Sequence, residues 1–180
     1  MRIWIVALLV LVATPLAAGP SPAPDPALAS LARLSGRAFD VAYMRVLIPR
    51  HEEAVEVALT ATLYADHTEL LRWNQRVIER KNAQVRLMLV RLQAAGATPG
   101  QRNVGVMTAT VKKIRTLRGA ALERTYMSFL IAHFDGNVAM SRLAATKGSR
   151  PEIQSLAQEV IRVDGQEAKM LRGWLKQWYP

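Results

Sequence analysis

The chain has 180 residues, 51% of them hydrophobic, with a formal net charge of +10 and no cysteine. The absence of cysteine excludes disulfide bonds, a cysteine nucleophile and a lipid anchor on an N-terminal cysteine, so the apolar core alone must stabilise the fold. The length suits one domain with a sizeable core. The sequence is rich in Ala, Leu, Val and Arg and lacks the alternation typical of strands, which predicts helices throughout.

Residues 1–18 have the three-part layout of a secretory signal peptide. Arg2 forms a short basic region, residues 3–13 are an unbroken apolar run, and the small residues 17–19 offer a cleavage site. We therefore expect export to the periplasm, the cell envelope or the outside of the cell. The alternative is a retained membrane anchor, but a spanning helix needs about 20 apolar residues. The Pro-rich segment 19–30 is expected to form a semi-extended tether.

An internal repeat dominates the rest of the chain. An offset of 83 residues aligns positions 34–92 with 117–175 without a gap, and the matched residues are mainly apolar and helix-spaced. Chance similarity between two amphipathic helices would not keep one offset through two helices and the turn between them. We therefore expect two copies of one helical hairpin, over residues 31–97 and 117–180.

The hydrophobic pattern predicts four long helices. In the first copy, apolar side chains recur at helical spacing across residues 39–58 and 70–92, and the second copy repeats this pattern. Residues 98–116 connect the copies, and the stretch 102–118 is expected to be a further helical segment. Two hairpins joined by one longer connection make an all-α four-helix bundle. Trp174 and Trp178 share a helix face and are expected to pack into the end of the bundle, with a partner contact as the alternative.

Each predicted turn ends in a sequence that resembles a helix cap. Residues 66–69 (Asp-His-Thr-Glu) and 149–152 (Ser-Arg-Pro-Glu) occupy the same register, and each places a Glu three positions after a capping residue. We expect Asp66 and Ser149 to cap the second helix of their copies. His67 lies at the first of these turns and is expected on the surface.

Short motifs in both copies resemble those of a known family. The family called domain of unknown function 305 (DUF305) has motifs similar to Phe39-Asp40, Met44, Ile48-Pro49-Arg50-His51, Ala54-Val55, Val160-Ile161, Glu167 and Trp174-Leu175. The resemblance covers residues 34–178. It implies a ferritin-like four-helix bundle and an exported protein, and some members of the family are linked to copper handling.

The chain departs from the family at its paired histidines. The family's His-His pair is Arg50-His51 in the first copy and His133-Phe134 in the second, so each copy keeps one histidine. Thioether and imidazole ligands suit Cu(I), and imidazole also suits Zn(II) or Cu(II). The resemblance therefore implies a metal site, for copper or a similar ion, with candidate ligands His51, His133, Met140, Met44, Met127 and Met88. The alternative is that the methionines fill the core and the histidines are satisfied polar groups.

A salt-bridged layer is the second interpretation of these departures. Asp164 and Glu167 lie on the apolar stripe of the last helix, where an unpaired charge would be costly to bury. Arg50 and Lys81 stand at positions that are His and Gln in the family. We hypothesise that Arg50 or Lys81 pairs with Asp164 or Glu167 across the bundle. The alternative is that the two acids tilt towards solvent.

No catalytic constellation is present in the sequence. A di-iron site needs Glu-x-x-His pairs, but the residues three positions before the histidines are Ile48, Tyr64 and Leu130. The sequence also has no Walker loop and no Gly-x-Ser-x-Gly elbow. We therefore expect a non-enzymatic binding protein for copper or a similar metal.

A basic stretch suggests an alternative function. Residues 80–118 carry nine Lys and Arg residues and no acid. A structural or interaction protein with a degenerate metal site could use this face to bind an anionic component of the cell envelope. A solvated face that keeps an exported protein soluble explains the same charge. Nucleic acid is not expected as a partner, because the protein is exported and aromatic residues do not interleave with the basic ones.

Overall fold

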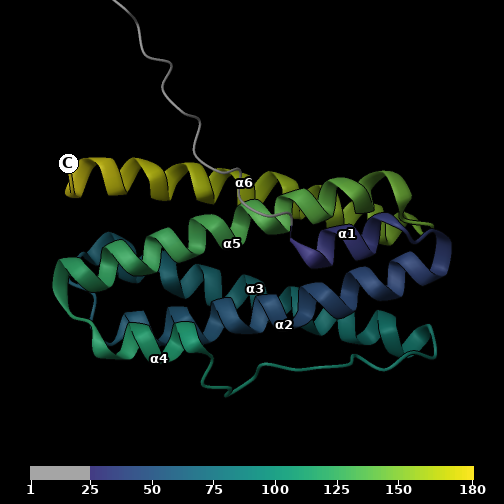
Figure 1. Cartoon of the computed structure of the whole chain (residues 1–180), viewed down its shortest axis with the longest axis horizontal. Helices are drawn as coiled ribbons and strands as arrows, with labels where there is room; N and C mark the ends of the chain where they lie inside the picture. The colour runs from purple at the N-terminus through teal and green to yellow at the C-terminus, as the bar shows by residue number, and fades with distance from the viewer. Residues whose placement is uncertain (1–24) are drawn as a thin grey trace, which may run out of the picture.

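The computed structural model describes residues 25–180, and six helices lie in this range. In chain order they are α1 (Pro26–Ala32), α2 (Gly36–Thr62), α3 (Thr68–Ala94), α4 (Ala109–Thr116), α5 (Gly119–Lys147) and α6 (Pro151–Trp178). The four long helices, α2, α3, α5 and α6, form the bundle, and the short α1 and α4 pack against it (Figure 1). No strand occurs within residues 25–180. The predicted all-α bundle of two hairpins is confirmed.

The two hairpins repeat each other helix by helix. α2 and α5 begin at Gly36 and Gly119, and α3 and α6 begin at Thr68 and Pro151, so both pairs of helix starts keep the same offset in the chain. Gly36 and Gly119 have φ angles of +56° and +54°, in the left-handed region that strains residues with a Cβ. The chain therefore enters the first helix of each copy through the same glycine turn.

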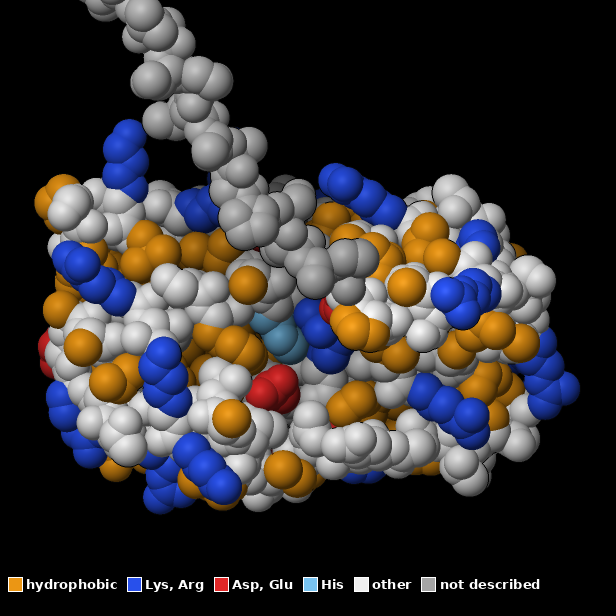
Figure 2. All heavy atoms as spheres, in the orientation of Figure 1, with side chains coloured by type: hydrophobic (Ala, Val, Ile, Leu, Met, Phe, Trp, Pro, Cys, Tyr) orange, Lys and Arg blue, Asp and Glu red, His pale blue; other side chains and the backbone are white. Residues whose placement is uncertain are grey.

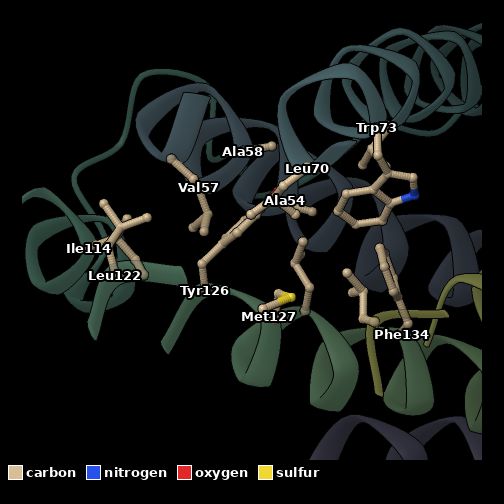
Figure 3. Close-up of a cluster of buried hydrophobic side chains, with 14 of the residues drawn as sticks. Ala54, Val57, Ala58, Leu70, Trp73, Ile114, Leu122, Tyr126, Met127 and Phe134 are labelled. Carbon is tan, nitrogen blue, oxygen red and sulfur yellow. The ribbon is translucent and has the colours of Figure 1, made fainter. Parts of the chain in front are cut away.

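The apolar core divides into two clusters along the bundle. The cluster around Trp73, called here the Trp73 cluster, is built from one half of the bundle and includes Ala54, Val57, Leu70, Tyr126, Met127, Phe134 and Leu171 (Figure 3). The Met44 cluster fills the other half and includes Phe39, Tyr43, Leu47, Met88, Met140, Ile153 and Val160. Trp174 and Trp178 pack against the Trp73 cluster at the end of the bundle, as the sequence predicted.

Each hairpin turn is held by a carboxylate from the other copy. Glu123 Oε1 accepts hydrogen bonds from the backbone N–H groups of Asp66 (2.7 Å) and His67 (2.9 Å). Asp40 Oδ1 accepts from the backbone N–H of Ser149 at 2.9 Å. Asp40 and Glu123 are repeat-equivalent, so the exchange is reciprocal. Both carboxylates are buried, and hydrogen bonds to a charged acceptor are among the stronger ones.

The predicted capping boxes are therefore wrong. The structure places the N-caps at His67 and Arg150, and neither side chain accepts a capping hydrogen bond. Asp66 and Ser149 lie one residue outside the caps. The sequence pattern is local, whereas the groups that satisfy these turns come from the opposite hairpin and are invisible to a local pattern.

Two connecting segments also differ from expectation. The expected tether is helical from Pro26 onwards, because Asp25 accepts a hydrogen bond from the N–H of Ala27 (2.9 Å) and Leu31 is buried. Between the copies, the helix begins only at Ala109, since upstream backbone N–H groups bond to α2. The N–H of Asn103, for example, donates to Glu52 Oε2 at 2.6 Å.

The predicted signal peptide, residues 1–18, lies outside the described residues. Within the part of the chain that the structure describes, no helix is both long and apolar enough to cross a membrane.

Candidate functional site

Polar side chains from all four long helices meet at the middle of the bundle, between the Trp73 cluster and the Met44 cluster. This polar layer consists of Arg50 and His51 of α2, Lys81 and Gln84 of α3, His133 and Asn137 of α5, and Asp164 and Glu167 of α6. All of them except Arg50 are buried. Figure 2 shows histidine atoms near the middle of one face, with basic and acidic side chains beside them.

A buried ion pair lies at the centre of the polar layer. Lys81 Nζ lies 2.6 Å from Asp164 Oδ1, and both side chains are 0% exposed. The amide of Asn137 donates to the other oxygen of Asp164 at 2.9 Å. Lys81 and Asp164 are 83 residues apart and occupy equivalent positions in the repeat. The hypothesised ion pair across the bundle is confirmed, and it joins the two copies at one shared position.

The second acid of the layer pairs with a residue that sequence reasoning missed. Glu167 forms its ion pair with Arg80, which reaches into the layer from a half-buried position on α3. Burial raises the pKa of Glu167, while the charges of Arg80 and Lys81 oppose that rise. Arg80 lies beside the apolar stripe of its helix, so hydrophobic spacing gave no signal for it.

Arg50 closes one side of the layer. Its Nε donates to Asn137 Oδ1 (2.9 Å), and its Nη2 donates to the backbone carbonyl of His133 (3.2 Å). Its Nη1 lies 3.4 Å from Asp25, the first described residue. The guanidinium fits closely over Gly136, where a Cβ would come within 2.6 Å of Nη2. Asn137 was not singled out from the sequence, although it lies on the buried stripe one turn after His133.

The two histidines of the layer have unpaired ring nitrogens. His51 is 0% exposed and His133 is 5% exposed. Neither ring nitrogen of His51 has a hydrogen-bond partner among the described residues, and neither does Nε2 of His133. Buried polar atoms are usually satisfied, so these three ring nitrogens are unusual, and Glu167 Oε2 in the same layer is also without a partner among the described residues. Both imidazoles offer a lone pair that nothing in the described chain uses.

Electrostatics keep both imidazoles neutral. Burial lowers the pKa of His51 well below its usual 6.5, and the positive charges of Lys81, His133 and Arg50 lower it further. The side chain of Gln84 raises the pKa of His51 slightly against this trend, although it forms no hydrogen bond with either ring nitrogen. Burial, Arg50 and Lys81 likewise lower the pKa of His133 well below its usual value. A neutral imidazole is the form that binds a metal ion.

The six predicted ligands do not form one group. Met44, Met88 and Met140 lie in the Met44 cluster, and Met127 lies in the Trp73 cluster on the opposite side of the layer. Met44 precedes His51 by seven residues, about 10.5 Å along a helix, as His133 precedes Met140. Only the two histidines share the layer. Within residues 25–180, no group of three or more His, Asp or Glu side chains is arranged to hold a metal.

The third histidine lies at the end of the bundle. His67 was expected on the surface, but its side chain is only 35% exposed and lies 2.6 Å from Glu123. Its ring stacks on Trp178 with a centroid separation of 4.0 Å. His67 therefore belongs to an aromatic cluster that covers the end of the Trp73 cluster, far along the bundle from the polar layer.

The fold is shared with solved structures. CopM in its Cu(I)-bound form superposes with a TM-score of 0.71 at 23% identity, over 78% of this chain and 98% of CopM. A DUF305 protein from Streptomyces coelicolor gives 0.70 at 19% identity, over 77% and 93% of the two chains. A DUF305 fragment from Deinococcus radiodurans gives 0.68 at 21% identity, over 77% and 95%. These likenesses show the fold alone.

Sequence comparison identifies the family. No curated protein matches the chain. The sequence model of the domain of unknown function DUF305 matches twice, over residues 16–92 and 90–175, so each match covers most of one of the two hairpins. The chain therefore belongs to the DUF305 family.

Proposed function

We propose that this chain is an exported, non-enzymatic protein that binds Cu(I), or a similar soft metal ion, through His51 and His133. The observation that carries the proposal is the set of unpaired ring nitrogens in the polar layer, two on His51 and one on His133. CopM, which shares this fold, has been solved with Cu(I) and with silver bound, and this supports the assignment of a soft ion.

The chemistry of the layer suits such an ion. Imidazole nitrogen binds copper in both oxidation states, and Cu(I) tolerates the few ligands that a pair of histidines supplies. Burial and the neighbouring cations disfavour protonation of both rings, so a metal ion would not have to displace a proton at neutral pH. The positive charge of Lys81, which would repel a metal ion, is balanced by Asp164.

The methionines have a secondary place in this proposal. Met44 and Met140 lie on the same helices as the histidines but two turns away, and Met88 packs with them in the Met44 cluster. Met44 would approach an ion in the polar layer if α2 shifted along its axis, and Met140 would do so if α5 shifted. Met88 lies on α3, so neither of these movements would bring it closer. Met127 lies on the opposite side of the layer and would need the reverse movement.

The test is a Cu(I) titration of tag-free protein in the presence of bicinchoninate as a competing chelator. We expect stoichiometric binding that a His51→Gln/His133→Gln variant loses. A His67→Gln variant is the matched control, because it removes the histidine that lies outside the layer and should retain binding. Equal binding by the double variant, or no binding by the unchanged protein, would overturn the proposal.

A second candidate function follows from the ion pair. The Lys81–Asp164 contact stabilises the layer without a metal, which favours a structural or interaction protein of the cell envelope if copper does not bind. Figure 2 shows Lys and Arg spread over the visible face rather than gathered in one patch. Vesicles that contain anionic lipid, tested at low and high salt, would measure any such attraction.

A further inference from the structure

A cavity of about 490 Å³ opens at the end of the bundle opposite the C-terminus. It lies where α2 and α6 begin and α3 ends, at the right of Figure 1. Its inner wall is apolar and includes Val41, Met44 and Ile153. Its volume falls within the range of small-molecule sites, which is about 300–1,000 Å³.

The internal repeat shows what the same place holds at the other end of the bundle. Three lining residues of the cavity, Arg91, Ala95 and Arg150, are repeat-equivalent to Trp174, Trp178 and His67. Those three rings form a continuous stack. Trp174 and Trp178 are parallel with centroids 4.9 Å apart, and Trp178 stacks on His67 at 4.0 Å. One end of the bundle is therefore filled by a column of flat rings, and the equivalent space at the other end is open.

The equivalent acids at the two ends of the bundle, Glu123 and Asp40, have different hydrogen-bond partners. Glu123 accepts hydrogen bonds from the Nδ1–H of His67 and the hydroxyl of Tyr179, both at 2.6 Å, and so ties the aromatic stack to the bundle. Among the described residues, its equivalent, Asp40, accepts only from Ser149, whose hydroxyl donates at 2.5 Å. Asp40 lines the cavity, and no side chain within residues 25–180 that hydrogen-bonds to it fills the space.

Arg91 and Arg150 stand at the opening in place of Trp174 and His67. Arg37, Arg91 and Arg150 line the cavity together with two acids, Asp40 and Glu152. Arg37 donates to the carbonyl of Ala95, and Arg91 donates to the carbonyl of Glu152. Arg150 forms no side-chain hydrogen bond or ion pair with any described residue. A guanidinium carries five N–H donors, so all three arginines retain donors for an anion.

We propose that this cavity binds a small aromatic carboxylate. The aromatic ring would occupy the apolar space that the stacked rings fill at the other end, and the carboxylate would accept hydrogen bonds from Arg91 and Arg150. Arginine matches a carboxylate in shape as well as charge, because two parallel N–H donors can meet its two oxygens. The site is independent of the polar layer and does not rest on copper binding.

Calorimetric titration of the full tag-free protein with indole-3-propionate tests the proposal. We expect saturable binding with one ligand per chain. Arg150→Gln should weaken it about tenfold, which is the scale of one charge-assisted hydrogen bond. Arg91→Trp/Ala95→Trp copies the filled end and should abolish it. A thermal melt identifies any variant that fails to fold. If Arg91→Trp/Ala95→Trp does not fold, the binding measured for Arg150→Gln decides the test. The His51→Gln/His133→Gln variant should bind as the unchanged protein does.

Two comparison ligands separate the components of recognition. Indole, which lacks the carboxylate, should bind at least about tenfold more weakly. Decanoate, which lacks the ring, should also bind more weakly, and tighter binding of decanoate would overturn the assignment of an aromatic ligand. Absence of saturable binding of indole-3-propionate at millimolar concentration, or unchanged binding by Arg150→Gln, would overturn the site.

Discussion

Lys81 and Asp164 occupy the same position in the two repeats and meet at 2.6 Å in the centre of the bundle. Equivalent residues that meet in this way would carry the same charge if the two copies were identical, and they would repel each other. The pair exists because one copy has a base where the other has an acid. Arg50 and His133 are also equivalent, and they also touch, through the Arg50 guanidinium and the His133 carbonyl. Two departures from the repeat therefore lie where the copies face each other in the polar layer.

Removing one partner of the central ion pair should destabilise the protein strongly. Lys81→Met leaves the Asp164 carboxylate buried without its counter-charge, which costs about 3–5 kcal/mol. Urea unfolding followed by circular dichroism measures this loss. The control is Arg172→Gln, which breaks the exposed Arg172–Asp135 pair and should cost less than about 1 kcal/mol. A Lys81→Met/Asp164→Leu variant should recover most of the stability. Similar losses for Lys81→Met and Arg172→Gln would contradict the prediction.

Stability should fall as the pH drops below neutrality, because of the two histidines in the layer. Their pKa values are lowered well below 6.5 in the folded protein, so below pH 6.5 the unfolded chain binds protons that the folded chain does not. The free energy of unfolding should therefore decrease as the pH falls from 6.5 towards the folded pKa values. Glu167 acts in the opposite sense, because its pKa in the folded protein is raised above the usual 4.5. Its contribution to the free energy of unfolding decreases as the pH rises above 4.5.

Urea unfolding at pH 7.5 and at pH 5.5 measures this dependence. His51→Phe copies the residue at the equivalent position, Phe134, and removes one of the two titrating groups. The variant should lose less stability than the unchanged protein between the two pH values. An equal loss in both proteins would show that His51 is free to take up a proton in the folded state.

Each reciprocal carboxylate should protect the turn of the opposite copy. Glu123→Ala removes the acceptor for the backbone N–H groups of Asp66 and His67, and their amide hydrogen exchange should accelerate. Asp40→Ala should accelerate exchange at Ser149 instead. The two variants serve as controls for each other when exchange is followed by NMR. Accelerated exchange at the turn of the mutated copy alone would contradict the exchange of carboxylates seen in the structure.

Replacing Gly173 and Gly136 by alanine should change the stability of the protein in opposite directions. Gly173→Ala meets no atom within 4 Å and should stabilise α6 by up to about 1 kcal/mol through helix propensity. Gly136→Ala gains the same propensity, but its Cβ would displace the Arg50 guanidinium from the carbonyl of His133. The lost hydrogen bonds to Arg50 should cost about 1.5–3 kcal/mol. Thermal unfolding of both variants checks this, and equal stabilisation by both would contradict it.

The features that could be predicted from the sequence are those repeated along helices. The hairpins, the inward place of His51 and the Lys81–Asp164 pair all follow from positions on apolar stripes, where a polar group must find a partner. The capping boxes were predicted wrongly because the deciding acceptors, Asp40 and Glu123, lie more than 50 residues away in the chain. The Asp25-Pro26 pair is typical of a helix start, but the Pro-rich composition around it outweighed that signal.

The arginine partners were harder to foresee. Arg80 reaches Glu167 through a long flexible side chain from a half-buried position on α3, so its position on the helix does not reveal where its charge lies. The unpaired ring nitrogens of His51 and His133 were likewise not foreseeable, because they depend on how the neighbouring helices pack around the two rings.

The exchange of carboxylates between hairpins is the contact pattern of a symmetric dimer. In such a dimer, residue i of one subunit contacts residue j of the other, and j contacts i in return. Asp40 and Glu123 do this within one chain, each holding the turn that belongs to the other hairpin. A single hairpin would leave its turn and its carboxylate without partners, so it would be complete only beside a second copy. Fusion of two copies into one chain frees them to diverge. The opposite charges of Lys81 and Asp164 are a divergence that two identical subunits could not adopt.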